Sequence, residues 1–143
     1  MKVVVDTNVI VSGLLSPFSS SGEIVRMAAS GELILCYDAR VLSEYTDVLN
    51  RPKFKFSPEL VAVFLDQIKN SGVASSGIPL ELKLPDTDDE AFLEIALSEN
   101  VTCLITGNIR HFPPKCRLGK KVLSPSDFIE YYRKNSKNSG IHY

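Results

Sequence analysis

The amino-terminal run Lys2–Val5 constrains the fold of this chain more than any other segment. Its three consecutive valines are β-branched, and the run is too short to form a helix. Uninterrupted apolar residues of this kind are typical of a strand that is buried on both faces of a parallel sheet. We therefore expect an α/β fold in which the first strand ends at Asp6 and a helix follows.

The rest of the chain alternates between strand and helix patterns. Further strands are expected at Leu33–Cys36, Val101–Thr106 and Lys121–Leu123, with one short strand near Leu80–Leu84. Helices are expected at Val9–Leu15, Ser21–Ala29, Ala39–Asn50, Glu59–Asn70 and Asp89–Glu99, and a last one follows the cap sequence at Ser124 and runs to about Arg133. This alternation predicts a three-layer α/β/α architecture with a doubly wound, mainly parallel sheet of about four to five strands.

The length of 143 residues, 44% of them apolar, suits one domain with a single core, which we place at residues 1–132. Residues 133–143 are rich in Lys, Asn and Ser and are expected to form a flexible tail. No apolar run is long enough to cross a membrane, and a strand rather than a signal peptide follows Met1. Three widely spaced cysteines, with no CxxC pair, are interpreted as buried thiols in a reducing compartment. A cytoplasmic location is expected.

Polar residues follow the expected strands at the edge where parallel sheets bind ligands. Asp6 and Asn8 follow the first strand, and Thr106 and Asn108 end the Val101 strand. Asp6 has a simpler alternative role, because a carboxylate there could cap the following helix.

Helical periodicity selects two further acids. Glu44 lies at the edge of the apolar stripe of its helix, although a glutamate at the rim of the core would occupy the same position. Asp89 shares a face with Phe92 and Leu93, whereas Asp88 is the expected N-cap and Asp86 is a loop acid that faces either the site or solvent. Three converging carboxylates would repel one another, and a divalent cation such as Mg²⁺ or Mn²⁺ resolves that conflict.

In their order and spacing these motifs resemble the PIN-domain ribonucleases, and within them the toxin-like proteins of toxin–antitoxin modules. The resemblance covers about residues 1–132. It is carried by Val-Val-Val-Asp-Thr-Asn at 3–8, Leu42-Ser43-Glu44 with Arg51-Pro52-Lys53-Phe54, Asp86-Thr87-Asp88-Asp89, and Leu104-Ile105-Thr106-Gly107-Asn108.

The resemblance implies a metal-dependent endoribonuclease. By it Asp6, Glu44 and Asp89 would bind Mg²⁺ or Mn²⁺, and Thr106 would line the site. Asn108 stands where the family often has a fourth acid, so it would be a weaker ligand and would favour one firmly bound ion. The resemblance also implies an RNA substrate, a cognate antitoxin protein and a homodimer.

The basic residues are concentrated in the last third of the chain. Residues 1–100 contain 8 Lys and Arg against 15 Asp and Glu, whereas residues 101–143 contain 8 against 2. RNA phosphates are expected to contact Arg110, Lys115, Arg117, Lys120 and Lys121. A solvated basic surface is the alternative. His111 lies in the same stretch and is expected to make a structural hydrogen bond rather than to act in catalysis.

Two other functions fit parts of the pattern. A catalytically weak PIN scaffold that binds RNA or a partner protein is suggested by Asn108. A phosphoacceptor or phosphatase-like domain also carries an aspartate after its first strand, but the second acid that such proteins need near Asp6 is replaced here by Asn8.

Overall fold

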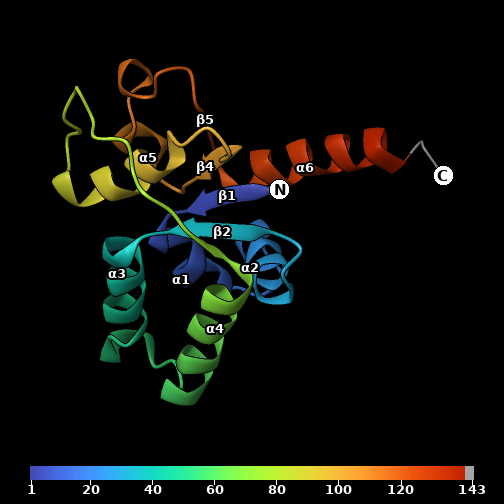
Figure 1. Ribbon diagram of the computed structural model, residues 1–143. Coiled ribbons are helices and arrows are strands. Elements are labelled where there is room, and N and C mark those ends of the chain that lie inside the picture. Colours follow the sequence, from blue (N-terminus) through green and yellow to red (C-terminus); the bar gives the residue numbers. More distant parts are fainter. Residues whose placement is uncertain (141–143) are drawn as a thin grey trace.

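β1 (Lys2–Val5) is the central strand of the sheet in the computed structural model, which describes residues 1–140 and the side chains of residues 1–135 (Figure 1). Val3, Val4 and Val5 are at most 1% exposed. β1 pairs in parallel with β2 (Ile34–Tyr37) on one side and with β4 (Cys103–Ile105) on the other. The predicted buried parallel strand is thus confirmed.

Within residues 1–140 the sheet has five strands, all parallel, in the order β3-β2-β1-β4-β5. Its edges are β3 (Val73–Ala74) and β5 (Lys121–Leu123). The described part of the chain forms six α-helices around it: α1 (Thr7–Leu15), α2 (Ser20–Ser30), α3 (Ala39–Leu49), α4 (Pro58–Ser71), α5 (Glu90–Ala96) and α6 (Pro125–Gly140). The first four helices lie on one side of β1 and β2, and α5 lies on the other (Figure 1). The predicted α/β architecture is confirmed.

The expected strand near Leu80–Leu84 is wrong. Its backbone does not pair with the sheet, because the N–H groups of Leu80 and Leu84 donate to the carboxylates of Glu94 and Glu90 on α5. The edge strand is instead the short β3, which follows α4 directly and pairs with β2.

The start of α5 also differs from the expectation that Asp88 caps a helix over Asp89–Glu99. A 3₁₀ turn, η2 (Thr87–Asp89), precedes α5, and the side chain of Asp86 caps it by accepting from the N–H of Asp88 at 2.9 Å. The carboxylate that can reach a free N–H two residues ahead takes the capping role. α5 then ends at Ala96.

α6 continues to Gly140, past the end expected near Arg133. Residues 134–140, which were expected to begin a flexible tail, are therefore helical, and residues 141–143 lie outside the described part of the chain. The helix begins as predicted, since Ser124 Oγ accepts from the N–H of Asp127 at 3.2 Å.

Cys36, Cys103 and Cys116 are buried free thiols, as expected. Burial raises the pKa of Cys103 to about 12. Across the described residues, no helix combines the length and the apolar character that a membrane crossing requires.

Candidate active site

Asp6 and Thr106 meet where the chain direction across the sheet reverses. β2 and β3 lie on one side of β1, and β4 and β5 lie on the other, so the crevice at the carboxyl ends of β1 and β4 is the switch point of the sheet. The backbone N–H of Asp6 donates to Ile105 O at 2.9 Å, which holds the two strand ends together. Thr106 Oγ1 donates to Asp6 Oδ2 at 2.8 Å.

The Asp6 carboxylate does not cap α1. Asp6 occupies the N-cap position, yet its side chain makes no capping hydrogen bond. Asn8 Nδ2 instead approaches Asp6 Oδ2 at 3.3 Å, and Asn8 Oδ1 accepts from the N–H of Gly107 at 3.1 Å. Asn8 therefore joins the segment after β1 to the segment after β4, consistent with its predicted position beside the site.

The charge of Asp6 is poorly compensated. Asp6 is 5% exposed, and burial raises its pKa from 3.8 to about 6. The hydrogen bond from Thr106 opposes this rise, and the negative charge of Asp89 adds to it. A buried carboxylate of this kind is stabilised in its ionised form by a nearby cation or by further hydrogen-bond donors.

Glu44 reaches the same region from α3. Burial raises its pKa, the hydrogen bond that Thr7 Oγ1 donates to Glu44 Oε2 at 2.5 Å opposes this, and the charge of Asp6 raises it further. The next residue, Tyr45, is fully buried, and its hydroxyl donates to Val5 O. This bond fixes α3 against the end of β1, so the Glu44 carboxylate has a defined place.

Asp89 completes the acidic group from η2. Its Oδ2 lies 3.0 Å from His111 Nδ1 in η3 (Ile109–His111). Burial raises the Asp89 pKa, His111 lowers it, and the charges of Asp86 and Glu44 raise it. The pKa of each of the three predicted acids is therefore raised in part by the negative charge of another of the three.

The remaining predicted site residues lie around this group. Asp86 is exposed, and its side chain is occupied as the cap of η2, although its charge reaches Asp89. Asn108 is exposed after β4, and its N–H donates to Thr106 Oγ1 at 3.0 Å. The sequence had not indicated that Thr7 and His111 contact the acids, because neither partner lies nearby along the chain.

A metal cage is not preformed. Among the described residues, no three His, Cys, Asp or Glu side chains are grouped so that they could together hold an ion. Mg²⁺ does not require such a cage, because it keeps several waters and commonly binds one or two carboxylates together with substrate phosphate. The donor set fits that mode, since it consists of hard oxygen ligands whose mutual repulsion a cation would relieve.

The predicted RNA-contacting cations lie in different parts of the structure. Arg110 in η3 and Lys115 in η4 (Pro114–Cys116) are exposed beyond the site strand. Lys121 begins β5 and therefore lies at the amino end of the sheet, away from the acids.

Two of these cations are engaged in structural bonds. Lys120 Nζ donates to Val101 O at 2.7 Å and to Ser98 O at 3.2 Å. Arg117 Nε donates to Phe112 O at 2.6 Å. Lys120 is therefore held by carbonyl oxygens, and Lys121 lies at the amino end of the sheet, so neither is placed beside the acids.

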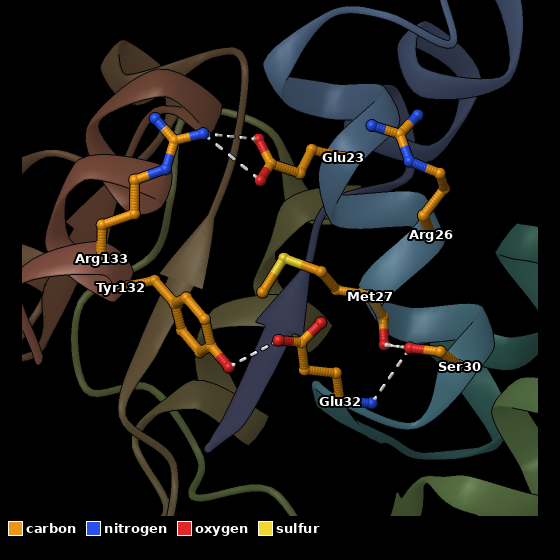
Figure 2. Close-up of a pocket in the computed structure, with 7 residues that line it drawn as sticks. All are labelled: Glu23, Arg26, Met27, Ser30, Glu32, Tyr132 and Arg133. Carbon is orange, nitrogen blue, oxygen red and sulfur yellow. Dashed lines mark hydrogen bonds and ion pairs between the residues drawn. The ribbon is translucent and has the colours of Figure 1, made fainter. Parts of the chain in front are cut away.

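One hollow in the surface is lined by predicted site residues, and a second hollow is not. One of about 340 Å³ is lined by Asp6, Asn8 and Glu44 together with apolar residues of α1, α3 and η1 (Pro52–Phe54). Another of about 720 Å³ lies between α2 and α6 (Figure 2). In the second, Arg133 faces Glu23 at 3.3 Å and Tyr132 donates to Glu32 at 3.0 Å, and none of the predicted site residues lines it.

Comparison with known proteins is consistent with this geometry. A family model described as PIN domain matches residues 2–110, which include Asp6, Glu44, Asp89 and Asn108. No curated protein and no solved structure shows a significant match to the chain. Because the family model covers more than half of the residues, the chain belongs to the PIN-domain family, whose members are generally nucleases.

Proposed function

We propose that this protein is a metal-dependent endoribonuclease that hydrolyses RNA phosphodiester bonds. The observation that carries the proposal is that Asp6, Glu44 and Asp89 lie near the switch point of the sheet, where burial raises the pKa of each acid and the negative charge of another of the three adds to the rise. In the described part of the chain, no Lys or Arg forms an ion pair with any of these three acids. A bound cation supplies the missing positive charge.

One or two of the acids Asp6, Glu44 and Asp89 would bind Mg²⁺ or Mn²⁺ directly, with the side-chain oxygen of Asn108 as a weaker ligand. When bound, the ion polarises the phosphoryl group, lowers the pKa of water and stabilises the leaving oxygen. Thr106 and Asn8 hold the Asp6 carboxylate in place. Thr7 does the same for Glu44.

The phosphates on either side of the cleaved bond need positive partners, because the acidic centre would otherwise repel RNA. Arg110 and Lys115 are exposed in the segment that follows Asn108 and are suited to this task. They contribute charge rather than sequence recognition.

The decisive experiment is cleavage of a 5′-labelled RNA by purified protein in Mg²⁺, in Mn²⁺ and in EDTA. We expect cleavage that requires metal and that Asp6→Asn abolishes. Asp66→Asn on the exposed face of α4 is the matched control and should retain full activity. Metal-independent cleavage, or full activity in Asp6→Asn, would overturn the site assignment.

We further propose that the protein is the toxin of a toxin–antitoxin pair, with a cognate antitoxin and a homodimeric state. This rests on its resemblance to toxin-like PIN proteins and on exposed apolar side chains that a partner could cover, such as Phe18 at 99% and Leu60 at 70% exposure. Expression should arrest growth, Asp6→Asn should not, and co-expression of the product of a short adjacent gene should restore growth. Growth arrest by Asp6→Asn would contradict a toxin role based on this site.

A catalytically weak scaffold that binds RNA or a protein is the second candidate. It is favoured by the uncharged Asn108 and by the lack of a preformed metal cage among the described residues. RNA binding without any metal-dependent cleavage would support it over the nuclease.

A further inference from the structure

We propose that Phe54 is a stacking platform for an unpaired base of single-stranded RNA next to the cleavage site, and that the neighbouring cations bind the adjoining phosphates. The inference rests on the proposed ribonuclease function and adds a base-binding side chain to its site. Phe54 lines the same hollow of about 340 Å³ as Asp6 and Glu44. That volume lies at the lower end of small-ligand sites, which span roughly 300–1,000 Å³.

The local backbone presents Phe54 at this position. Pro52 begins the short helix η1, and Lys55 ends it in the left-handed conformation with φ of 57°. A lysine rarely adopts this conformation, so the turn is held by its surroundings. On either side of Lys55, the rings of Phe54 and Phe56 stack with centroids 5.6 Å apart and planes inclined by 16°.

The two rings have different roles. Phe56 packs against the hydrophobic core, whereas Phe54 is not among the side chains that pack against it. Phe54 is therefore supported from beneath by an anchored ring and borders an open hollow. A half-buried aromatic side chain with this support adds little to the core, but it offers a rigid face to a planar ligand.

The charges around the platform favour a polyanion. Lys53 and Lys55 are exposed, and Lys53 Nζ lies over the Phe54 ring at 5.0 Å from its centroid, whereas the nearby Arg51 forms an ion pair with Asp47 at 3.0 Å. An exposed cation–π contact contributes only about 0.5–1 kcal/mol, whereas stacking of a base on an aromatic side chain contributes about 1–3 kcal/mol. A base can therefore displace Lys53, which is then free to bind a phosphate.

These cations are also better placed than part of the predicted basic segment. Lys121 lies at the amino end of the sheet and Lys120 is engaged by two carbonyl oxygens, whereas the η1 segment borders the hollow that contains Asp6. The substrate must be unpaired, because bases inside a duplex are already stacked and present only their edges.

The test measures binding of a labelled single-stranded RNA and of its duplex by fluorescence anisotropy in EDTA, so that no cleavage occurs. Phe54→Ala should weaken binding of the single strand by about 5- to 100-fold and leave duplex binding unchanged. Phe54→Trp should retain the affinity. Tyr131→Ala removes an aromatic side chain of α6 that also has a lysine over its ring but lies outside the hollow, so it is the matched control and should bind like the wild type.

An abasic scan makes the test specific. Removing one base at the platform position should reproduce the loss seen in Phe54→Ala, and the two changes together should cost no more than either alone. Lys53→Gln should make the slope of log affinity against log salt concentration shallower by about one, which corresponds to the loss of one phosphate contact. Lys121→Gln should leave this slope unchanged. Unchanged single-strand affinity in Phe54→Ala, equal losses for single strand and duplex, or additive losses in the scan would each overturn the platform.

The platform and the nuclease can fail separately. Phe54-dependent binding in EDTA by a protein that never cleaves would retain the platform and reject the nuclease. Metal-dependent cleavage with an unchanged KM in Phe54→Ala would retain the nuclease and reject the platform.

Discussion

His111 Nδ1 lies 3.0 Å from Asp89 Oδ2 and joins the segment after β4 to the turn before α5. The two residues are 22 positions apart in the sequence. The contact holds one oxygen of an acid that we propose as a metal ligand and leaves the other oxygen available. His111 thus makes the structural hydrogen bond expected for it, but it makes that bond to a residue of the site.

We predict that His111 positions Asp89 for the metal. His111→Ala should weaken Mg²⁺ affinity by about 10-fold, in line with the effect of losing a partner that orients a ligand. His111→Asn, which keeps a donor near the position of Nδ1, should recover part of the loss. Isothermal titration calorimetry measures both variants, and tighter binding by His111→Ala would instead show that His111 competes with the metal for Asp89.

We predict that Asp6 costs stability at neutral pH in the metal-free protein. Its folded pKa of about 6 lies above the ordinary 3.8, so the folded state binds more protons than the unfolded state between these values. Stability is therefore lost as the pH rises from about 4 to about 6 and is level above that. Asp6→Asn should raise the free energy of unfolding by about 1–3 kcal/mol at pH 7.5.

Urea denaturation in EDTA at pH 4 and at pH 7.5 tests this prediction. The gain of Asp6→Asn should be mostly lost at pH 4, where the wild-type carboxyl is protonated in the folded state and only partly ionised in the unfolded state. A gain of equal size at both pH values would show that its origin is not the Asp6 charge.

We predict that divalent metal stabilises the folded protein through the three acids. At a Mn²⁺ concentration of 100 times Kd the gain is about 2.7 kcal/mol, which corresponds to a rise in Tm of roughly 5–10 °C for a domain of this size. Thermal denaturation with Mn²⁺ and with EDTA measures the shift. The same shift in Asp6→Asn would place the metal elsewhere.

We predict that Lys120 is a structural residue rather than an RNA ligand. Its ammonium group donates to Ser98 O and Val101 O and so joins the end of the α5 segment to the approach to β4. Lys120→Ala should lower the free energy of unfolding by about 1–2 kcal/mol, because hydrogen bonds from a charged group are lost. The exposed Lys115 of η4 is the control, and Lys115→Ala should change stability by less than about 0.5 kcal/mol. Urea denaturation gives both values, and equal effects would contradict the assignment.

Local pattern was sufficient to predict most of the sheet. The valines of β1 required burial on both faces, and the apolar periodicity of α3 and α5 indicated which acids lie beside the core. These properties depend on residues within a few positions of one another. Asp6, Glu44 and Asp89 could therefore be selected from the sequence, whereas their role as metal ligands stays a prediction.

The segment between α4 and α5 could not be predicted in this way. The apolar residues near Leu80–Leu84 have a strand-like pattern, but the backbone N–H groups of Leu80 and Leu84 donate to the carboxylates of Glu94 and Glu90. Which acceptor a loop N–H reaches depends on where a distant helix packs. Local propensity carries no information about that packing.

The sequence by itself determined the parallel α/β fold, the buried strand before Asp6 and the helical phase of Glu44 and Asp89. Only the tertiary structure decided that Thr106 holds Asp6, Thr7 holds Glu44 and His111 holds Asp89. It also showed that Lys120 makes a structural hydrogen bond rather than lining the site, and that Phe54 lies beside the site. The physical reason is that periodicity fixes which face of an element is buried, whereas hydrogen bonds between side chains far apart in sequence depend on how the elements cross in space.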